Sequence, residues 1–181
     1  GMKGNIGGVI LFDETIKQNS DDGTSLVSLI LDQGALPGIK VDQGLQPLDG
    51  YPEETLTQGL EGLGERCDEY FKLGAKFTKW RAVIKIGDGM PSAKCIEDNM
   101  QALADYAKIV QQSNMVPMVE PEVLMEGGHT VDQCLDVSKR CLNALFSSLK
   151  KNDVNIAGII LKPNMVTSGS TNANQASVDE V

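Results

Sequence analysis

The chain has 181 residues, of which 41% are hydrophobic and 23% charged, and this is enough apolar material for the core of one soluble domain of ordinary size. The formal net charge of −9 argues against nucleic acid or an anionic membrane surface as a partner. The sequence contains no signal peptide and no apolar run of the roughly 18 residues that a membrane span requires, so we expect no membrane insertion.

Gly1-Met2 resembles a remnant of tag cleavage followed by an initiator methionine, and we expect a single domain over residues 3–181. Five short apolar runs in this domain alternate with segments of helical character. Strands are predicted over 8–12, 38–42, 77–86, 116–124 and 156–161. The segment 26–31 is predicted to form a helix or turn ended by Gly34.

Three further helices are predicted from periodicity and from end signals. One covers about 59–73 and ends at Gly74, one begins after a Ser92 cap, and one begins at Thr130 in a capping box with Gln133. Residues 43–58 contain two glycines and two prolines, and we expect a long loop there.

The alternation of strands and helices predicts βαβ units around a parallel sheet, which is an α/β fold. No G-x-G-x-x-G follows the first strand, so a dinucleotide-binding fold lacks its fingerprint. A TIM (β/α)8 barrel fits better, although that fold needs eight strands and about 250 residues. We therefore expect an incomplete barrel of about five parallel strands with helices. Residues 177–180 resemble a capping box that no helix follows.

Charged residues interrupt the apolar strands at regular intervals. Same-face residues on a strand are two apart, so the charges form three pairs and one single residue: Lys40 and Asp42, Lys79 and Arg81, Glu120 and Glu122, and Lys162. Successive strands place one such residue at steps of 39, 41 and 42 positions. A single charge near a strand end is more often a solvated cap. Four strands with the same pattern instead favour a shared pocket at the carboxyl ends of a barrel.

Lys162 closes the run 156–161, which is predicted to be a fully buried strand. Burial and cationic neighbours favour the neutral amine of a lysine, and a neutral amine can attack a carbonyl to form a Schiff base. Trp80 lies on the face opposite to Lys79 and Arg81, and we interpret it as a packing residue.

The only histidine, His129, lies in a glycine-containing loop and is expected to be solvated. One histidine excludes a zinc site with two or three imidazoles within this chain. The four cysteines show no C-x-x-C pair, which favours buried or half-buried thiols in a reducing cytosol: Cys67, Cys95, Cys134 and Cys141.

Several segments together resemble the class I fructose-bisphosphate aldolase family. They are Gly8-Val9-Ile10-Leu11-Phe12, Gly38-Ile39-Lys40-Val41-Asp42, Lys79-Trp80-Arg81, Val119-Glu120-Pro121-Glu122 and Leu161-Lys162-Pro163-Asn164-Met165-Val166. The resemblance spans barrel strands two to six and implies a cytoplasmic glycolytic lyase without a metal or other cofactor. The implied substrate is fructose 1,6-bisphosphate, with fructose 1-phosphate left open.

The resemblance also implies roles for individual residues. Lys162 would be the Schiff-base nucleophile, Glu120 the general acid and base, and Lys79 the charge that helps keep the Lys162 amine deprotonated. Glu122 would assist near the iminium. The residues implied to bind substrate and phosphate are Lys40, Arg81 and Asp42.

The family's first, seventh and eighth strands would lie outside this chain, so we expect the chain alone to have little or no activity. The resemblance further implies a homo-oligomer, a tetramer in the family, with possible binding of cytoskeletal proteins or adhesin tails. Two alternatives stay open, namely another Schiff-base barrel enzyme of the transaldolase or deoxyribose-phosphate aldolase type, and a non-catalytic peptide-binding scaffold.

Overall fold

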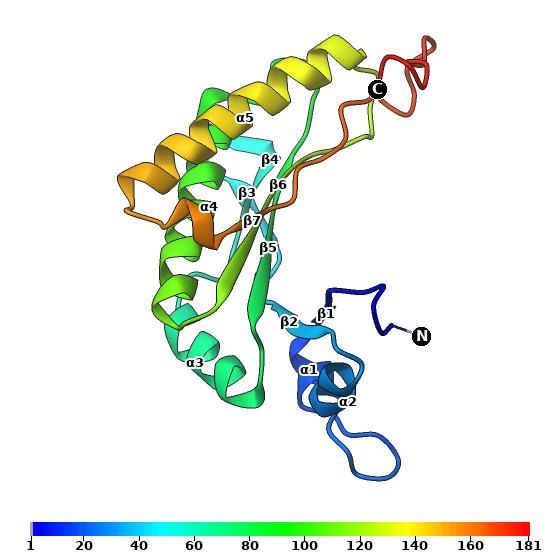
Figure 1. The fold of residues 1–181 in the computed structure, drawn as a ribbon. Helices are drawn as coiled ribbons and strands as arrows, with labels where there is room; N and C mark the ends of the chain where they lie inside the picture. The colour runs from blue at the N-terminus through cyan, green and yellow to red at the C-terminus, as the bar shows by residue number, and fades with distance from the viewer. Residues whose placement is uncertain (1) are drawn as a thin grey trace.

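The structure is a computed structural model that describes residues 2–181, so Gly1 of the expected tag remnant lies outside the described residues. Its main feature is a five-stranded parallel sheet with the strand order β1-β2-β5-β6-β7 (Figure 1). The strands span Gly8–Leu11 (β1), Leu36–Lys40 (β2), Phe77–Ile84 (β5), Val116–Val123 (β6) and Ile160–Leu161 (β7). The predicted parallel α/β arrangement is confirmed.

Three long helices cover one face of this sheet (Figure 1). They span Leu63–Leu73 (α3), Ala93–Gln112 (α4) and Val131–Lys151 (α5), while the short helices Asp13–Ile16 (α1) and Leu26–Asp32 (α2) lie beside β2. The predicted caps are present. Ser92 Oγ accepts a hydrogen bond from Cys95 N, and Thr130 forms the capping box with Gln133. The helix predicted from residue 59 begins later, because Gly59 and Gly62 adopt φ of 123° and 62° and the chain turns there.

Burial alternates along β5 and separates the two faces of the sheet. Thr78, Trp80 and Ala82 are fully buried, whereas Lys79 and Arg81 are partly exposed. Trp80 packs against Tyr106 of α4 with ring centroids 5.3 Å apart, which confirms its role as a packing residue. The helices therefore lie on the Trp80 side of the sheet, and the charged residues lie on the other.

The segment 43–58 forms a β-hairpin instead of the predicted loop. Strands Leu45–Leu48 (β3) and Tyr51–Thr57 (β4) pair antiparallel. Only Asp49 and Gly50 lie between them, and Gly50 has φ of 80°. An Asp-Gly pair is a strong signal for a two-residue hairpin turn. The glycines and prolines of this segment predicted a loop, but a two-stranded ribbon tolerates prolines such as Pro47 and Pro52 that a central strand would not.

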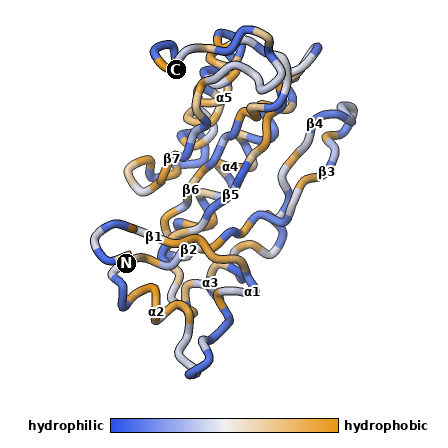
Figure 2. The backbone as a smooth tube through the Cα atoms, turned by 90° about the vertical axis from the view of Figure 1, so that its right-hand side faces the viewer, coloured by the Kyte–Doolittle hydropathy of each residue, from blue (hydrophilic) through white to orange (hydrophobic). Residues whose placement is uncertain are grey.

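The run 156–161 is not the fully buried strand that the sequence predicted. Residues Ile156–Gly158 form a 3-10 turn, and only Ile160 and Leu161 pair with β6. Ile156 and Ile160 are 42% and 40% exposed, because β7 is the last strand in the sheet order and has a neighbour on one side only. In Figure 2, where β7 lies beside β6 at this edge, hydrophobic colour is also prominent along β1 and β2 at the opposite edge of the sheet.

His129 is buried, with 4% of its surface exposed, and so the expectation that it is solvated is wrong. The segment that follows Met165 folds back over its loop, and Gly169 N donates to His129 O at 2.8 Å. Burial lowers the pKa of His129.

All four cysteines are free and buried, as predicted. Ser177 N donates to Glu180 Oε2 in a turn at the end of the chain.

Within residues 2–181 no helix combines the length and the apolar character needed to cross a bilayer.

Candidate active site

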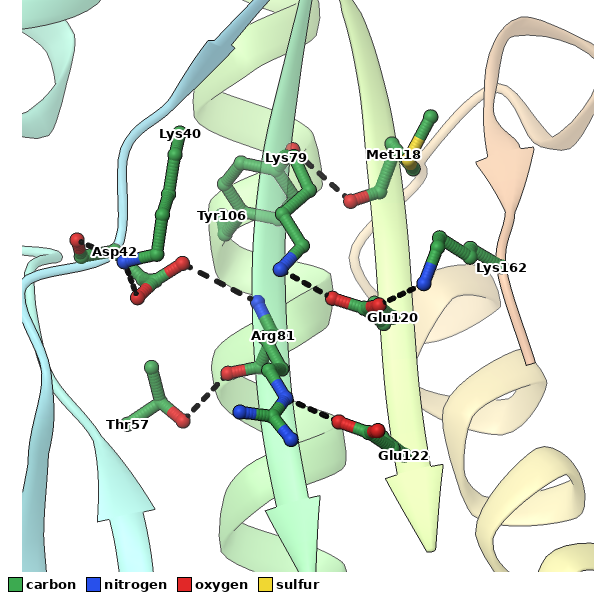
Figure 3. Close-up of polar contacts among 10 residues, drawn as sticks. All are labelled: Lys40, Asp42, Thr57, Lys79, Arg81, Tyr106, Met118, Glu120, Glu122 and Lys162. Atoms are coloured by element: carbon green, nitrogen blue, oxygen red, sulfur yellow. Dashed lines mark hydrogen bonds and ion pairs between the residues drawn. The ribbon is translucent and has the colours of Figure 1, made fainter. Parts of the chain in front are cut away.

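The centre of the candidate site is the carboxylate of Glu120, which lies between two lysine amines (Figure 3). Lys79 of β5 places Nζ 2.6 Å from Glu120 Oε2, and Lys162, directly after β7, donates from Nζ to Oε1. The Glu120 side chain is 5% exposed, against 15% for Lys79 and 55% for Lys162. Three neighbouring strands, β5, β6 and β7, thus bring one buried carboxylate and two lysine amines into contact.

The electrostatics of Glu120 follow from this arrangement. Burial alone would raise the pKa of its carboxyl, because the charged form loses hydration. The hydrogen bonds from Lys162 and Lys79 outweigh that effect and hold the pKa of Glu120 below its ordinary value. Glu120 is therefore a carboxylate at neutral pH.

Arg81 and Glu122 form the next pair toward the carboxyl ends of β5 and β6. Arg81 Nε donates to Glu122 Oε2. In the strand register Arg81 lies opposite Glu120, and Val83 lies opposite Glu122. Each cation of β5 therefore contacts the carboxylate one same-face step further along β6, and the two pairs have the same offset.

Lys40 and Asp42 form a third group, at the end of β2. Lys40 Nζ contacts Asp42 Oδ1 and the Asp42 backbone oxygen, and Arg81 N donates to Asp42 Oδ2 at 3.4 Å. Asp42 is nearly buried, with a side chain 6% exposed. Its carboxylate therefore joins β2 to β5 and orients the Lys40 amine.

The structure brings all seven predicted site residues onto the sheet face that points away from helices α3, α4 and α5 (Figure 3). This arrangement differs from the prediction in one respect. The predicted reason for a reactive Lys162 was burial at the rim of a core, whereas its side chain is 55% exposed. Its charged neighbours in the structure are Glu120, which it contacts, and Lys79, which contacts the same carboxylate.

Sequence reasoning missed two residues that bond to these strands, one from the helix layer and one from the hairpin. Tyr106 of α4 shares a hydrogen bond with Thr78 Oγ1 at 2.6 Å and donates to Met118 O at 3.3 Å. Thr57 Oγ1 of β4 donates to Arg81 O at 2.8 Å. Tyr106 lies three residues after Leu103 on the buried stripe of α4. The hydroxyl of a buried tyrosine needs a hydrogen-bond partner, so the position of Tyr106 on this stripe could have predicted a bond to the neighbouring strands.

No group of three or more histidine, cysteine, aspartate or glutamate side chains is arranged to hold a metal ion in the part of the chain that the structure describes.

Comparison with protein families matches the fructose-bisphosphate aldolase class-I model over residues 1–181. The chain belongs to the class I fructose-bisphosphate aldolase family. This confirms the resemblance that the strand motifs indicated. Class I aldolases are metal-independent Schiff-base enzymes.

Curated relatives and a solved structure support the assignment. The chain is 52% identical over 176 residues to a "Probable fructose-bisphosphate aldolase class 1" of Xanthomonas campestris, covering 97% of this chain and 53% of that protein. It is 50% identical over 171 residues to "Fructose-bisphosphate aldolase 6, cytosolic" of Arabidopsis thaliana, covering 94% of this chain and 48% of the relative. The chain thus spans about half the length of the curated relatives it matches.

The aldolase of Plasmodium falciparum, solved in complex with TRAP and a small molecule inhibitor, superposes with a TM-score of 0.95 at 43% identity, over 97% of this chain and 51% of that one. The fold class, an α/β sheet that forms part of a TIM-barrel aldolase, is confirmed.

Proposed function

We propose that the whole protein is a Schiff-base lyase that cleaves fructose 1,6-bisphosphate to dihydroxyacetone phosphate and glyceraldehyde 3-phosphate. Membership of the aldolase family supports the reaction class. One observation carries the proposal for the site, namely that Glu120 contacts the amines of both Lys79 and Lys162. A nucleophilic amine, a carboxylate that exchanges protons with it and a second cation are the groups that a metal-independent aldol cleavage needs.

In this proposal Lys162 supplies the nucleophile. Two ammonium groups around one carboxylate carry a net positive charge, and loss of one proton from Lys162 leaves a balanced Lys79–Glu120 pair. The free amine adds to the C2 carbonyl of the ketose, and the Glu120 carboxylate moves the ammonium proton of the adduct to its alkoxide oxygen to give the carbinolamine. Glu120 then takes up one proton from solvent and passes it to the carbinolamine hydroxyl, which leaves as water. The product is a protonated iminium on Nζ of Lys162.

The iminium then accepts the electron pair of the breaking C3–C4 bond. The C4 hydroxyl gives up its proton, the aldehyde leaves, and an enamine remains on Lys162. A proton returned to C3 regenerates the iminium, and water releases the ketone. Glu120 serves as the proton donor and acceptor, and Glu122, held by Arg81, lies one same-face step along β6 to assist it.

Lys40 and Arg81 are the proposed phosphate ligands. Both cations lie on the same sheet face as Lys162, and local positive charge can attract a phosphorylated sugar to an acidic protein. The Asp42 carboxylate is an unfavourable neighbour for a phosphate. We therefore assign Asp42 to the substrate-binding group through the Lys40 amine that it orients.

The test is to incubate the whole protein with dihydroxyacetone phosphate, reduce it with borohydride and locate the adduct by mass spectrometry. The expected adduct is on Lys162. The variant Lys162→Met should lose the adduct, whereas Lys139→Met, on the exposed side of α5, should retain it. An adduct on Lys79 instead would reverse the proposed roles, and an active enzyme without any adduct would exclude Schiff-base chemistry.

We further propose that the whole protein is a cytosolic homo-oligomer. The Arabidopsis relative is named as cytosolic, and the resemblance to the family implies the homo-oligomer. Fractionation and light scattering on the whole protein test the two parts. The Plasmodium falciparum aldolase was solved in complex with TRAP, and co-precipitation of the whole protein with TRAP tests whether it binds the same partner.

A further inference from the structure

The segment that carries Lys162 is held by very few backbone bonds. Strand β7 pairs with β6 at two positions, Ile160 with Met118 and Leu161 with Val119. Lys162 N then donates to Val119 O at 3.0 Å, and the next residue is Pro163, which has no N–H to donate. The backbone ladder ends at the residue that must place its amine on Glu120.

The side chain of Asn164 takes over where the ladder stops. Asn164 Oδ1 accepts a hydrogen bond from Val123 N at 3.2 Å, at the end of β6. In a regular parallel ladder a backbone carbonyl of the neighbouring strand would accept this bond. Val123 is 1% exposed, and a buried N–H without an acceptor would be costly.

The amide nitrogen of Asn164 contacts a helix that covers the sheet. Asn164 Nδ2 donates to Ser138 Oγ of α5 at 3.1 Å and to Met165 O at 3.0 Å. Ser138 is 8% exposed. One side chain thus links the segment after β7 both to the end of β6 and to the helix that packs on it.

The two ties lie on either side of the candidate acid and base. Lys162 N is bonded at Val119, and Asn164 is bonded at Val123, so Glu120 and Glu122 lie between the two points of attachment. These two hydrogen bonds fix the path of the backbone of residues 162–164 beside Glu120. The Lys162 side chain itself is flexible and 55% exposed.

We propose that Asn164 is a positioning residue, which holds Lys162 in the geometry in which its amine meets Glu120 and the substrate carbonyl. This inference rests on the proposed function. Asn164 acts through the backbone of residues 162–164 and has no assigned contact with substrate. Its loss should therefore slow the chemistry at Lys162 and leave phosphate binding by Lys40 and Arg81 largely unchanged.

The experiment compares Asn164→Ala with the parent in the whole protein. We expect kcat and the rate of borohydride trapping at Lys162 to fall by about tenfold or more, with KM within about twofold, because small displacements of a reacting group have large effects on rate. Asn164→Asp keeps the acceptor for Val123 N and should retain most of the trapping rate. If Asn164→Ala does not fold, Asn164→Gln, which moves the amide by one methylene, replaces it with the same expected loss.

Gln111→Ala is the matched control. Gln111 is also an amide that anchors this connection, through Asn155 and Gly158, but it does so before β7. Its variant should lower the melting temperature as Asn164→Ala does and keep the trapping rate within about twofold.

Normal trapping in Asn164→Ala, or an equal loss in Gln111→Ala, would overturn the inference. Failure of the parent to trap at Lys162 would instead contradict the proposed function, so the two failures are distinguishable.

Discussion

At the scale of single residues, Glu120 is the group on which the site depends. Its carboxylate is nearly buried and contacts two lysines that come from the strands on either side of β6. A buried carboxylate with one cation would be a structural ion pair. Two ammonium groups around one carboxylate leave one positive charge in excess, and in the proposed mechanism the loss of a proton from Lys162 removes it.

Replacing Glu120 by glutamine should therefore disable proton transfer while keeping the shape of the side chain. We expect kcat of the whole protein to fall by about a hundredfold or more, which is the usual effect of losing a general acid and base. Steady-state kinetics measures this. Glu126→Gln, an exposed carboxylate in the loop after β6, is the control and should remain within about twofold. A Glu120→Gln enzyme with parental kcat would remove Glu120 from the mechanism.

The same residue predicts a dependence of stability on pH. The pKa of Glu120 is lowered in the folded state, so its ion pairs stabilise the fold above the unfolded value of about 4.3. That stabilisation is lost as the pH falls through the lowered folded pKa, where the carboxylate becomes protonated. Urea unfolding of parent and Glu120→Gln should show a gap in free energy at pH 7 that narrows below about pH 4.3. A gap that stays constant with pH would contradict the assignment of this shift.

At the scale of helices and strands, contacts on the helix-covered face of the sheet help to align β5 with β6, the strands whose opposite face carries the charged residues. Tyr106 is fully buried and bonds to Thr78 of β5 and Met118 of β6, the strands that carry Lys79 and Glu120. A single hydroxyl on α4 thus spans the two strands whose relative position brings Lys79 to Glu120. Besides their backbone pairing over eight positions, these strands therefore share a contact that no charged residue makes.

Tyr106→Phe should lower the free energy of unfolding by about 1–2 kcal/mol, because it leaves the Thr78 hydroxyl and the Met118 carbonyl without this buried partner. Urea denaturation of the whole protein gives the value. Tyr51→Phe is the matched control, since Tyr51 is 41% exposed on the hairpin and its loss of a hydroxyl should change stability by less than about 0.5 kcal/mol. Equal effects for the two variants would show that the Tyr106 bonds do not hold the strands.

The sequence predicts the faces of the strands well and the edges of the sheet poorly, for physical reasons. Charges two residues apart in an apolar run are a local pattern, and Lys79, Arg81 and Glu120 share one face of β5 and β6 as that pattern predicts, although they lie within the strands and not at their carboxyl ends. The length and burial of β7 depend on a neighbour that a local pattern does not contain. The burial of His129 depends on a contact with Gly169, 40 positions away, and the residues around His129 do not predict that contact.

At the scale of the whole molecule, the described residues form an open sheet, and two features follow from that. The sheet ends in β1 on one side and β7 on the other, and each has a partner strand on one side only. The edges also expose large apolar side chains, with Ile10 and Ile160 each 40% exposed and Phe12 65% exposed. Unpaired edge strands with apolar side chains are templates for pairing with another chain.

We therefore expect the 181-residue chain, expressed by itself, to associate, and light scattering should give a mass well above 19.4 kDa. Placing a lysine at an edge should weaken that association, because charged side chains block strand pairing. Ile10→Lys and Ile160→Lys are the test variants, and each should shift the mass toward that of one chain. Val178→Lys, at a position 93% exposed and away from both edges, should leave the mass unchanged. A monodisperse monomer with the helix content of the structure would show that these edges are protected in solution.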